Sequence, residues 1–559
     1  MPKANRVQII KYGPPPPELP VFGKVKPEEV SFIGRTNYVA SLEEKKFIFG
    51  IKRIDRRRHL YIIGKSGVGK TKLLELFIRQ DVTYGHGLCL IDPHGDVVEA
   101  VLDYIPKERI DDVCIIDPTD IDYPASFNPL ANVDPLFKFQ LTQGLIEVFQ
   151  KQFGANWTPR LEHVFRFTCL ALLDYPHATM RGMISMLTDR NYRQKVVEYI
   201  TDDMVKRFFA IEFADWSEKF DTDAIIPLVN KLGQFLSDPL LRNIFGQKQN
   251  KIDIGKLMNN QNIILINLSK GRLGEENSSF LGSIFLTKIK QAGMERAGIA
   301  EKDRKDFYLY VDEFQNVVTQ TFENILSEAR KYGLNLTVAH QYVGQIIQKV
   351  HQAVLGNCGS VITFRIGGED AVKMKPEFAP VFDIKDMINL AVGEIYVKMT
   401  IDGESYDPFS AETLKVLPPI HPSYRKEIIE ASRRKYSIPK GDAAKLIAEE
   451  EATIIRSAEE KAIIEGKGKG KKNENNKDES SREESEEESE EDPRFELVKQ
   501  LLEYQAFKEA AADLGKRPLL ERDVFVRSAP LPAEIEKQDI EEDELIEVNI
   551  FELLSLIHI

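Results

Sequence analysis

Apolar runs of strand length alternate with a helical pattern between residues 59 and 130. The runs at 59–63, 87–92 and 113–117 are bounded by polar or turn-forming residues, which is typical of buried strands. Residues 73–79, between the first two runs, have the spacing of a helix. Because strands that alternate with helices favour parallel pairing, this pattern predicts the βαβ units of a parallel sheet.

A different pattern, with apolar residues at helical spacing, covers residues 134–245. Within it, Thr158 followed by Pro159 predicts the N-cap and first residue of a helix. Strand-like runs then return, at 263–268, 307–311, 334–339 and 361–366. The sheet that begins before residue 130 is therefore expected to be completed after residue 260. The pattern predicts the α/β fold class, with a mostly parallel sheet and an inserted all-helical subdomain.

The same patterns divide the chain into seven expected segments. They are a flexible and β-rich lead (1–50), the first part of the α/β core (51–133), the all-helical subdomain (134–245), the second part of the core (246–425), a charged helix (441–466), a low-complexity acidic linker (467–493) and a helical and acidic tail (494–559). The composition of the linker is too polar to bury a core, so we expect it to be disordered.

Composition narrows the class of protein. The chain of 559 residues is 42% hydrophobic and 29% charged, which is typical of soluble globular proteins. Its apolar runs are shorter than the roughly 18 residues that a membrane span needs, and a proline run stands where a secretory peptide would be apolar. The four cysteines are far apart, with no CxxC pair. We therefore expect a cytoplasmic protein with no membrane span, no disulfide frame and no zinc site.

The net charge of −13 is concentrated near the C-terminus. Residues 478–492 contain ten acidic residues and one Arg, and so carry nine of the thirteen net negative charges. The rest of the chain is nearly neutral. This distribution argues against a basic coat over the whole protein, while leaving a local basic channel for nucleic acid possible.

A glycine-rich motif follows the first predicted strand and precedes the first predicted helix. It matches the phosphate-binding pattern GxxxxGK[ST] and consists of Gly64, Lys65, Ser66, Gly67, Val68, Gly69, Lys70 and Thr71. Its glycines allow backbone N–H groups to approach phosphates, and the helix that follows points its positive end at the same place. Lys70 is expected to neutralise the β and γ phosphates of ATP, and Thr71 to bind Mg²⁺. The alternative, a chance glycine-rich turn, does not explain the strand and helix on either side.

Two adjacent acids, Asp312 and Glu313, end the predicted strand at 307–311. Neighbouring residues of a strand point to opposite faces, so the two carboxylates need not share one task. We expect Asp312 to hold Mg²⁺, through water or Thr71, and Glu313 to orient and deprotonate the attacking water. Acids also end many strands that have no such role, so the prediction depends on the phosphate-binding motif.

Two polar residues follow the acids. Arg330 lies near the end of a predicted helix at 321–332, where cations complement the helix C-terminus and Gly333 provides a cap. Gln341 ends the strand that begins at 334. It is either a sensor of the γ-phosphate or an ordinary strand-end amide.

Six motifs in order along residues 45–400 carry a resemblance to a known family. They are GKSGVGKT after HLYII, LIDPHGD at 90–96, FNPL at 127–130, LINLSKG at 265–271, YVDEFQN at 310–316 and SEARKYGLNLTVAHQ at 327–341. Together they resemble the coupling proteins of type IV secretion systems (TraG/TraD-like). These are conjugative DNA-transfer ATPases within the FtsK/HerA-type P-loop translocases.

The resemblance implies a homo-hexameric ring of RecA-like P-loop NTPase domains that moves DNA through a central channel with ATP and Mg²⁺. It also implies that Arg330 contacts the nucleotide of the neighbouring subunit and that Gln341 senses the γ-phosphate. Expected partners are DNA, a relaxase or accessory DNA-binding protein, and a membrane-anchored secretion channel. Family members usually begin with membrane-spanning helices. Since no such span is found here, a partner is expected to recruit the protein to the inner face of the membrane.

Two other functions stay open at this point. One is a soluble HerA/FtsK-like DNA motor in repair or packaging. The other is a nucleotide-gated adaptor that docks cargo with little turnover.

Two further clusters also have alternative interpretations. Residues 92–96 (DPHGD) fit an Asp-Pro turn better than a metal site. The four arginines at 53 and 56–58 fit contact with nucleic-acid phosphates, contact with acidic neighbours, or a solvated patch.

Overall fold

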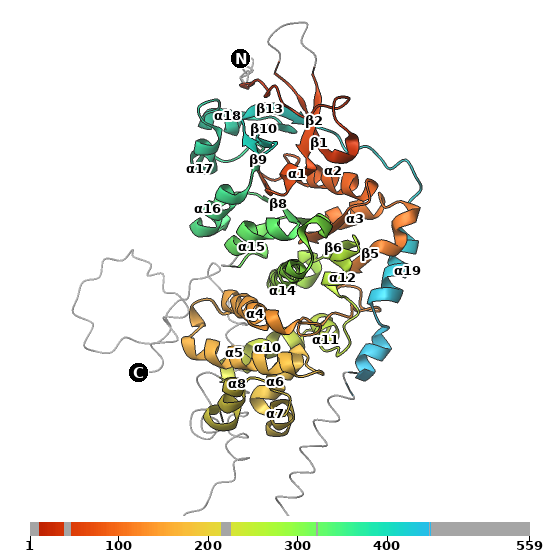
Figure 1. Ribbon diagram of the computed structural model, residues 1–559, viewed down its shortest axis with the longest axis vertical. Helices are drawn as coiled ribbons and strands as arrows, with labels where there is room; N and C mark the ends of the chain where they lie inside the picture. Colours follow the sequence, from red (N-terminus) through yellow and green to blue (C-terminus); the bar gives the residue numbers. More distant parts are fainter. Residues whose placement is uncertain (1–9, 39–45, 214–224, 320–321, 447, 449–559) are drawn as a thin grey trace, which may run out of the picture. The chain divides into compact units, whose positions relative to one another are not determined.

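The structure is a computed structural model that describes residues 10–38, 46–213, 225–319, 322–446 and 448 (Figure 1). The segments expected at 467–493 and 494–559, and most of the helix expected at 441–466, lie outside these residues. Among the described helices, none combines the length and apolar character needed to cross a lipid bilayer.

The strands account for the apolar runs of the sequence. Their bounds are β1 Val30–Thr36, β2 Ile48–Lys52, β3 Leu60–Ile63, β4 Gly87–Asp92, β5 Val113–Ile116, β6 Ile263–Asn267, β7 Phe307–Val311, β8 Leu334–His340, β9 Ser360–Thr363, β10 Glu394–Lys398, β11 Thr400–Ile401, β12 Glu404–Ser405 and β13 Phe409–Thr413. The predicted strands are confirmed, most of them to within one residue at each end. The run at 361–366 is the exception, because the chain leaves the sheet after Thr363 and turns over the glycine-rich loop.

The helices fall before, between and after these strands. Their bounds are α1 Arg53–Arg56, α2 Lys70–Thr83, α3 Asp96–Leu102, α4 Lys138–Phe153, α5 Pro159–Asp174, α6 Met180–Thr188, α7 Arg190–Val197, α8 Asp203–Arg207, α10 Ile225–Ser237, α11 Pro239–Phe245, α12 Ile254–Asn259, α13 Lys270–Leu273, α14 Glu275–Glu295, α15 Phe322–Glu328, α16 Gln348–Asn357, α17 Gly368–Phe378, α18 Ile384–Asn389 and α19 Arg425–Tyr436. Short 3₁₀ turns include η8 Phe314–Asn316, η9 Ala329–Tyr332 and η10 Val343–Gln345.

A mixed sheet organises the described residues. Its strand order is β2-β1-β13-β10-β9-β3-β8-β7-β4-β6-β5. All pairings from β9 to β5 are parallel, whereas those among β2, β1, β13, β10 and β9 are antiparallel. The predicted α/β class with a mostly parallel sheet is therefore confirmed. The carboxyl ends of β3, β8, β7 and β4 lie at one edge, where ligands bind in sheets of this kind.

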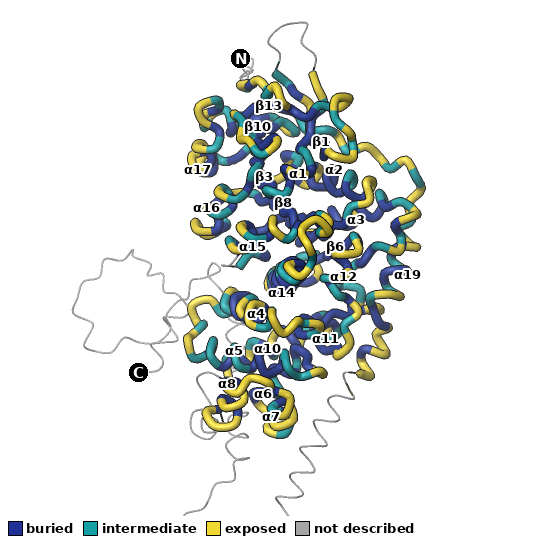
Figure 2. The backbone as a smooth tube through the Cα atoms, in the orientation of Figure 1, coloured by how far each residue is buried: buried dark blue, intermediate teal, exposed yellow. Residues whose placement is uncertain are grey.

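The two faces of the sheet pack against different hydrophobic cores. Along β3, Tyr61 and Ile63 belong to one core, and Leu60 and Ile62 belong to the other. The first core also contains α14, α15 and most of the apolar residues from α4 to α11, and the second contains α2 and α3. Strands buried on both faces read as continuous apolar runs, and Figure 2 shows this buried interior.

The first 50 residues contribute strands to the main sheet. β1 pairs with β13 and with β2, so the β-rich part expected here extends the antiparallel side of that sheet. Ile33 of β1 and Phe49 of β2 belong to the second core. Backbone pairing and apolar packing thus both hold these strands to the sheet.

Between β5 and β6 the described chain is helical. The N-terminus of α5 is formed as predicted, with the Thr158 side chain accepting from Leu161 N–H and Pro159 in the first turn. Helix α4 packs along α14, which belongs to the second part of the core. The apolar residues of this helical region are thus continuous with the core on one face of the sheet.

Helix α19 covers the edge strand β5. The backbone N–H of Ile115 donates to Ser432 Oγ at 2.8 Å, and Arg433 pairs with Asp120 just beyond the strand. A hydroxyl of α19 therefore satisfies a donor that another strand would otherwise take.

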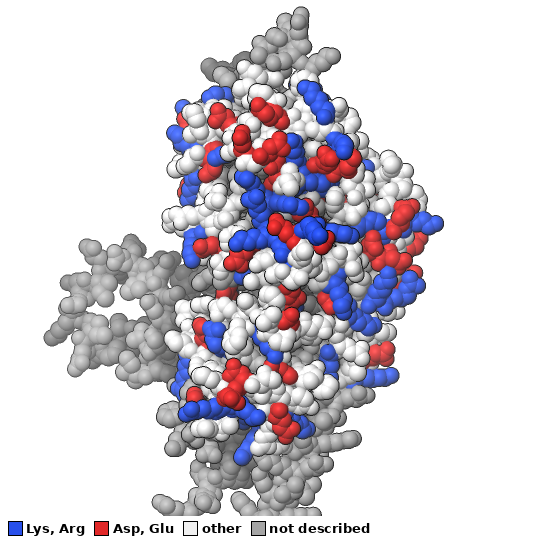
Figure 3. Space-filling model, in the orientation of Figure 1, with Lys and Arg blue, Asp and Glu red and all other residues white. Residues whose placement is uncertain are grey.

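On the face shown in Figure 3, Lys and Arg side chains are interspersed with Asp and Glu. This agrees with the near neutrality of the chain outside residues 478–492.

A buried ionic network holds α1 and α2 to the sheet. Asp81 of α2 has no exposed surface and accepts from Arg53 at 2.5 Å and from Arg56 at 2.9 Å. Arg56 also donates to Tyr310 Oη at 2.6 Å, and Tyr310 donates to Asp81. Burial alone would raise the pKa of Asp81, but the two arginines outweigh burial and the pKa is lowered. For Arg53 and Arg56, contact with an acidic neighbour is therefore the correct interpretation.

Replacing Asp81 should destabilise the protein strongly. Asp81→Asn leaves two buried guanidinium groups without their counter-charge, which costs about 3–5 kcal/mol. Asp402→Asn is a matched control, because Asp402 pairs with Lys52 at 2.6 Å but its side chain is 64% exposed. An exposed pair of this kind contributes less than about 1 kcal/mol. Urea-unfolding midpoints of the full-length variants measure both effects, and equal midpoints would contradict the assignment.

Candidate active site

The glycine-rich loop Gly64–Thr71 joins β3 to α2 at the carboxyl edge of the sheet. Gly67 and Gly69 adopt φ values of 74° and 118°, which residues with a Cβ rarely reach. Gly69 caps α2 without a side-chain acceptor, so the first N–H groups of this 14-residue helix have no side-chain partner at the cap. An anion can satisfy these N–H groups and is favoured by the helix dipole. The backbone of the loop therefore fits a phosphate.

A second segment of the chain lies against the loop. A Cβ added to Gly64 would lie 2.6 Å from Phe364 Cβ, so only glycine fits there. Lys65 N–H donates to Arg365 O at 2.9 Å. The turn after β9 thus holds the loop in place from the neighbouring strand.

Lys70 is the buried cation of the site. Its ammonium donates to Gly64 O at 2.6 Å and Lys65 O at 3.0 Å, and the residue is 6% exposed. Burial lowers the pKa of Lys70, and the charges of Asp312 and Glu313 oppose this shift. The charges of Lys70 and of the two strand-end acids therefore act on one another.

Asp312 is a crowded carboxylate at the end of β7. It accepts from Glu313 N–H at 2.9 Å, and its own N–H donates to Ile91 O at 3.2 Å. Burial, followed by the nearby charges of Asp92 and Glu313, raises the pKa of Asp312 to about 6. Lys70 opposes the shift but does not cancel it. A divalent cation would relieve this crowding, so the environment of Asp312 fits the Mg²⁺ of a nucleotide. Thr71, its predicted partner in binding Mg²⁺, is exposed in the first turn of α2.

Asp92 has a structural role. Its carboxylate accepts from His94 N–H at 3.0 Å, Val97 N–H at 2.8 Å and Val98 N–H at 3.1 Å, and so holds the turn between β4 and α3. This supports the turn over the metal site at residues 92–96. In the part of the chain that the structure describes, no group of three or more His, Cys, Asp or Glu residues is arranged to hold a metal ion.

Glu313 is held by amide side chains on both carboxylate oxygens. Gln341 Nε2 donates to Oε1 at 2.5 Å, and Gln315 Nε2 donates to Oε2 at 2.8 Å. The Glu313 backbone is left-handed, with φ 46° and ψ 48°, and Asn316 Nδ2 donates to its carbonyl at 2.9 Å. Non-glycine residues adopt this conformation rarely, and it is often found at functional sites. The carboxylate is thus placed at the sheet edge by contacts from two loops.

The structure brings Gln341 to the site. It follows β8, which lies between β3 and β7 in the sheet, and its amide reaches Glu313. The sequence left a contact with the γ-phosphate open, the family resemblance implied it, and neither anticipated a contact with the acid. A strand-end amide at this position can make both contacts in turn.

Arg330 lies away from the site of its own chain. It is exposed in η9, before β8 begins, whereas Gln341 follows the end of β8. The 7 residues of β8 separate the two by roughly 20 Å. Arg330 is instead near His59, whose pKa is lowered to about 4 by burial, with the charge of Arg330 adding to the effect. Its predicted contact with a nucleotide is therefore open only to the nucleotide of another subunit.

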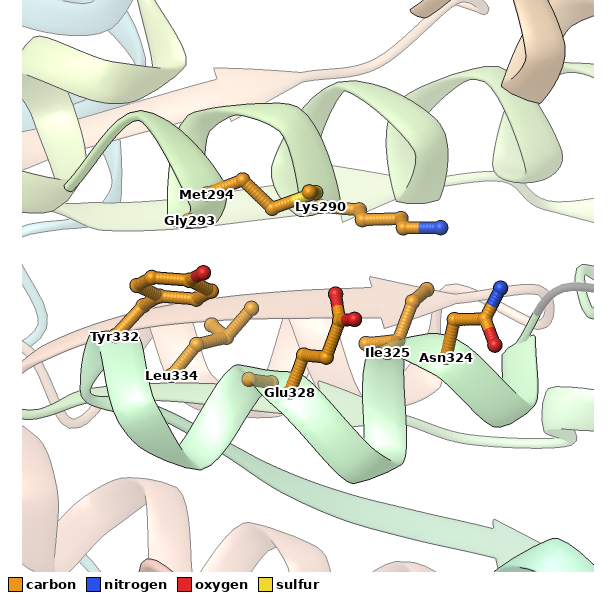
Figure 4. A pocket seen from close by; sticks show the side chains of 9 residues that line it. Lys290, Gly293, Met294, Asn324, Ile325, Glu328, Tyr332 and Leu334 are labelled. Atoms are coloured by element: carbon orange, nitrogen blue, oxygen red, sulfur yellow. The ribbon is translucent and has the colours of Figure 1, made fainter. Parts of the chain in front are cut away.

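The segment that carries Arg330 packs on α14 over a small cavity. Figure 4 shows Lys290 and Gly293 of α14 facing Ile325 and Glu328 of α15. The cavity measures about 10 Å³, which is room for about one water molecule. It is far too small for a nucleotide.

Sequence reasoning did not single out two residues that contact the predicted site. Gln315 lies two positions after Glu313 in a tight turn, and this spacing was a usable signal. Phe364 packs on Gly64 from about 300 residues away, and this contact leaves no trace in the local sequence.

Residues 306–375 match a family described as "TraM recognition site of TraD and TraG". The match includes β7 with its two acids, the turn with Arg330, and β8 with Gln341. It confirms, over these residues, the resemblance to the TraG/TraD-like coupling proteins.

The other likenesses are weaker or shorter. The plasmid coupling protein TrwB in complex with ADP and Mg²⁺ is 15% identical, over 67% of this chain and 89% of that chain, with a TM-score of 0.49. VirB4 of Thermoanaerobacter pseudethanolicus is 16% identical, over 64% and 89%, with a TM-score of 0.44. Scores this low support no conclusion by themselves. Segregation and condensation protein A of Myxococcus xanthus (strain DK1622) is 58% identical over 43 residues, which are 8% of this chain and 15% of that protein.

The raised pKa of Asp312 predicts an effect on stability. The folded-state pKa of about 6 exceeds the usual value of 3.8, so the charged side chain destabilises the nucleotide-free protein above pH 6. This cost, up to about 3 kcal/mol, disappears below about pH 4, where the carboxyl is protonated in both states. Asp312→Asn should therefore raise the urea midpoint at pH 7.5 and change it little near pH 4.

Asp407→Asn is a suitable control, because Asp407 is exposed. It should leave the midpoint unchanged at both pH values. An Asp312→Asn variant that is no more stable than the parent at pH 7.5 would show that this carboxylate is not under electrostatic strain.

Proposed function

We propose that this protein is an ATP-hydrolysing DNA translocase that acts as a coupling protein in conjugative or type IV secretion DNA transfer. The observation that carries the proposal is the meeting of three strand ends. The loop after β3, the acids after β7 and the amide after β8 lie at one edge of the sheet. When bound, Mg-ATP would supply the phosphoryl group that is transferred to water, and its divalent cation would balance the negative charge of the phosphates.

Nucleotide binding is assigned to the loop Gly64–Thr71. Its unpartnered helix N-terminus and the ammonium of Lys70 fit the β and γ phosphates. Thr71 and Asp312 are assigned to Mg²⁺, which usually takes one or two protein oxygens together with phosphate oxygens and waters. A single strained carboxylate beside the loop suits this requirement.

Hydrolysis is assigned to Glu313. The residue is 7% exposed and its carboxylate is fixed in direction by two amides, so it is suited to orient a water molecule and take its proton. Gln341 is assigned to report the state of the γ-phosphate. When its amide turns to the phosphate, it leaves one oxygen of Glu313 free to accept from water.

We assign the completion of the site to the assembly of subunits. The position of Arg330, about the length of β8 away from the loop of its own chain, supports contact with the nucleotide of the next subunit. An arginine supplied in this way stabilises the transition state only where two subunits meet. Hydrolysis would then depend on a ring, which we propose to be a homo-hexamer.

The family match at residues 306–375 and the ordered motifs support conjugative DNA as the proposed substrate. The name of that family also suggests a docking partner of the TraM type. The membrane-anchored channel stays a proposal based on the resemblance.

ATP hydrolysis that DNA stimulates is the decisive test. The parent protein should hydrolyse Mg-ATP faster when DNA is added, and Lys70→Ala should lose both ATP binding and turnover. Glu313→Gln should bind ATP normally while its kcat falls by about 10²–10⁴-fold. Phosphate release and fluorescent-nucleotide binding measure the two properties.

Lys107→Ala provides a control, because Lys107 is an exposed lysine remote from the loop. It should behave as the parent does. If the parent binds ATP but shows negligible turnover with and without DNA, the protein is an adaptor and the motor proposal is wrong.

Mixed assemblies test the role of Arg330. Arg330→Ala and Lys70→Ala are each expected to be inactive alone, but a mixture contains interfaces that pair an intact arginine with an intact loop. Such mixtures should recover part of the parental turnover. Native mass spectrometry must show that the subunits have mixed. Mixed rings without any recovery would mean that Arg330 does not act across the interface.

A further inference from the structure

Gln315 is tied to Glu313 through a single polar contact. Its Nε2 donates to Glu313 Oε2 at 2.8 Å. The other polar atom of the amide, Oε1, is buried and has no hydrogen-bond partner among the described residues. A buried amide that served only packing would ordinarily satisfy both atoms. The contact with Glu313 is therefore the one hydrogen bond that holds this side chain in place.

The turn that carries Gln315 is fixed from the helical side of the protein. The carbonyl of Asn316 accepts from Lys151 Nζ at 2.5 Å and from Ser279 Oγ at 2.6 Å. The next carbonyl, of Val317, accepts from Ser283 Oγ at 2.9 Å. Lys151 belongs to α4 of the inserted region and the two serines belong to α14 of the second part of the core, so helices from both parts determine where Gln315 lies.

The two amides on Glu313 differ in their attachment. Gln315 belongs to the same turn as Glu313, whereas Gln341 comes from the next strand and is half-buried. A movement of the loop after β8 can remove Gln341 from the carboxylate. The same movement leaves Gln315 in place, because Gln315 travels with the turn. Only Gln315 can thus hold the carboxylate throughout a cycle in which Gln341 changes partner.

We propose that Gln315 is a positioning residue for the hydrolytic carboxylate of Glu313. Its N–H donor fixes the direction of one oxygen, so that the other oxygen is free to accept a proton from water. This inference rests on the proposed function for its catalytic part. It assigns no contact between Gln315 and substrate.

A cavity beside the turn makes the residue accessible to substitution. It measures about 370 Å³ and is lined by Gln315 and Thr319 on one side and by Gln150 and Lys151 of α4 on the other. Gln315→Leu removes the donor with little change in size, and the space next to it can accommodate the branched side chain. Gln315→Glu places a like charge in the same position.

Steady-state kinetics test the proposal. Gln315→Leu should lower kcat by about 10- to 100-fold, as is typical when a contact that orients an active group is lost, with ATP affinity unchanged. Gln315→Glu, which has no N–H donor to offer, should lower kcat at least as much. A purely structural role would lower the yield of folded protein and ATP binding together, and would not lower the kcat of the folded protein alone.

Gln150→Leu is the matched control, since Gln150 lines the same cavity from α4. It should keep the parental kcat and ATP affinity. If Gln315→Leu also keeps the parental kcat in a protein that hydrolyses ATP, the inference is overturned while the proposed function stands.

A measurement without turnover keeps the inference testable if the parent protein proves inactive. The Gln315 donor can stabilise the protein through this contact only while the Glu313 carboxylate is present to accept it. Gln315→Leu should therefore melt about 2–4 °C below the parent, and should change the melting temperature much less in a Glu313→Ala background. The Gln150→Leu control should have the same effect in both backgrounds. Equal effects of Gln315→Leu in the two backgrounds would mean that its amide does not hold Glu313.

Discussion

Parallel pairing of β3 with β8 and of β7 with β4 determines where every candidate residue of the site lies. Ile63 is paired with His340, and Val311 with Ile91, so the loops that follow these strands begin at the same level of the sheet. Lys70, Asp312, Glu313 and Gln341 are up to 271 positions apart in the sequence, yet the register brings them to one edge. The same register places Arg330 at the opposite edge, because it precedes a strand whose end carries Gln341. Position relative to a strand, more than distance along the chain, thus separates Arg330 from the other candidate residues.

Two buried carboxylates of the fold have pKa values that are shifted in opposite directions. Asp81 is surrounded by two arginines and a tyrosine hydroxyl, and its pKa is lowered. Asp312 has other acids nearby and one lysine, and its pKa is raised. The first arrangement secures α2 against the sheet, at the end of that helix remote from the loop. The second leaves uncompensated negative charge where a metal-bound nucleotide is proposed to bind. Part of the stability gained at Asp81 can offset the cost at Asp312.

The sequence predicted the parts of this arrangement that depend on local patterns. Apolar runs indicated the strands, and the phosphate-binding motif between a strand and a helix indicated the loop. Acids and an amide at strand ends were recognisable because parallel strands place such ends together. Contacts that depend on packing were not predictable in the same way. Phe364 packs on Gly64, β1 pairs with β13, and Lys151 and Ser279 donate to the turn after Glu313. Each of these contacts joins residues that are far apart in the sequence and share no motif. The sequence also could not show whether Arg53 and Arg56 are buried or lie in a surface patch, because a cluster of arginines has the same composition in both cases.

The cover that α19 provides for β5 has a practical consequence for how the protein is handled. An uncovered edge strand offers a row of free backbone donors and acceptors to any other chain, and this favours edge-to-edge aggregation. Ser432 and its helix occupy part of that row although they lie more than 300 residues beyond the strand. A shortened protein that ends before Arg425 would retain all the proposed catalytic residues but would expose the backbone donors and acceptors of the edge strand β5. Low solubility of such a truncation would then reflect a lost protective helix rather than a defect in the site.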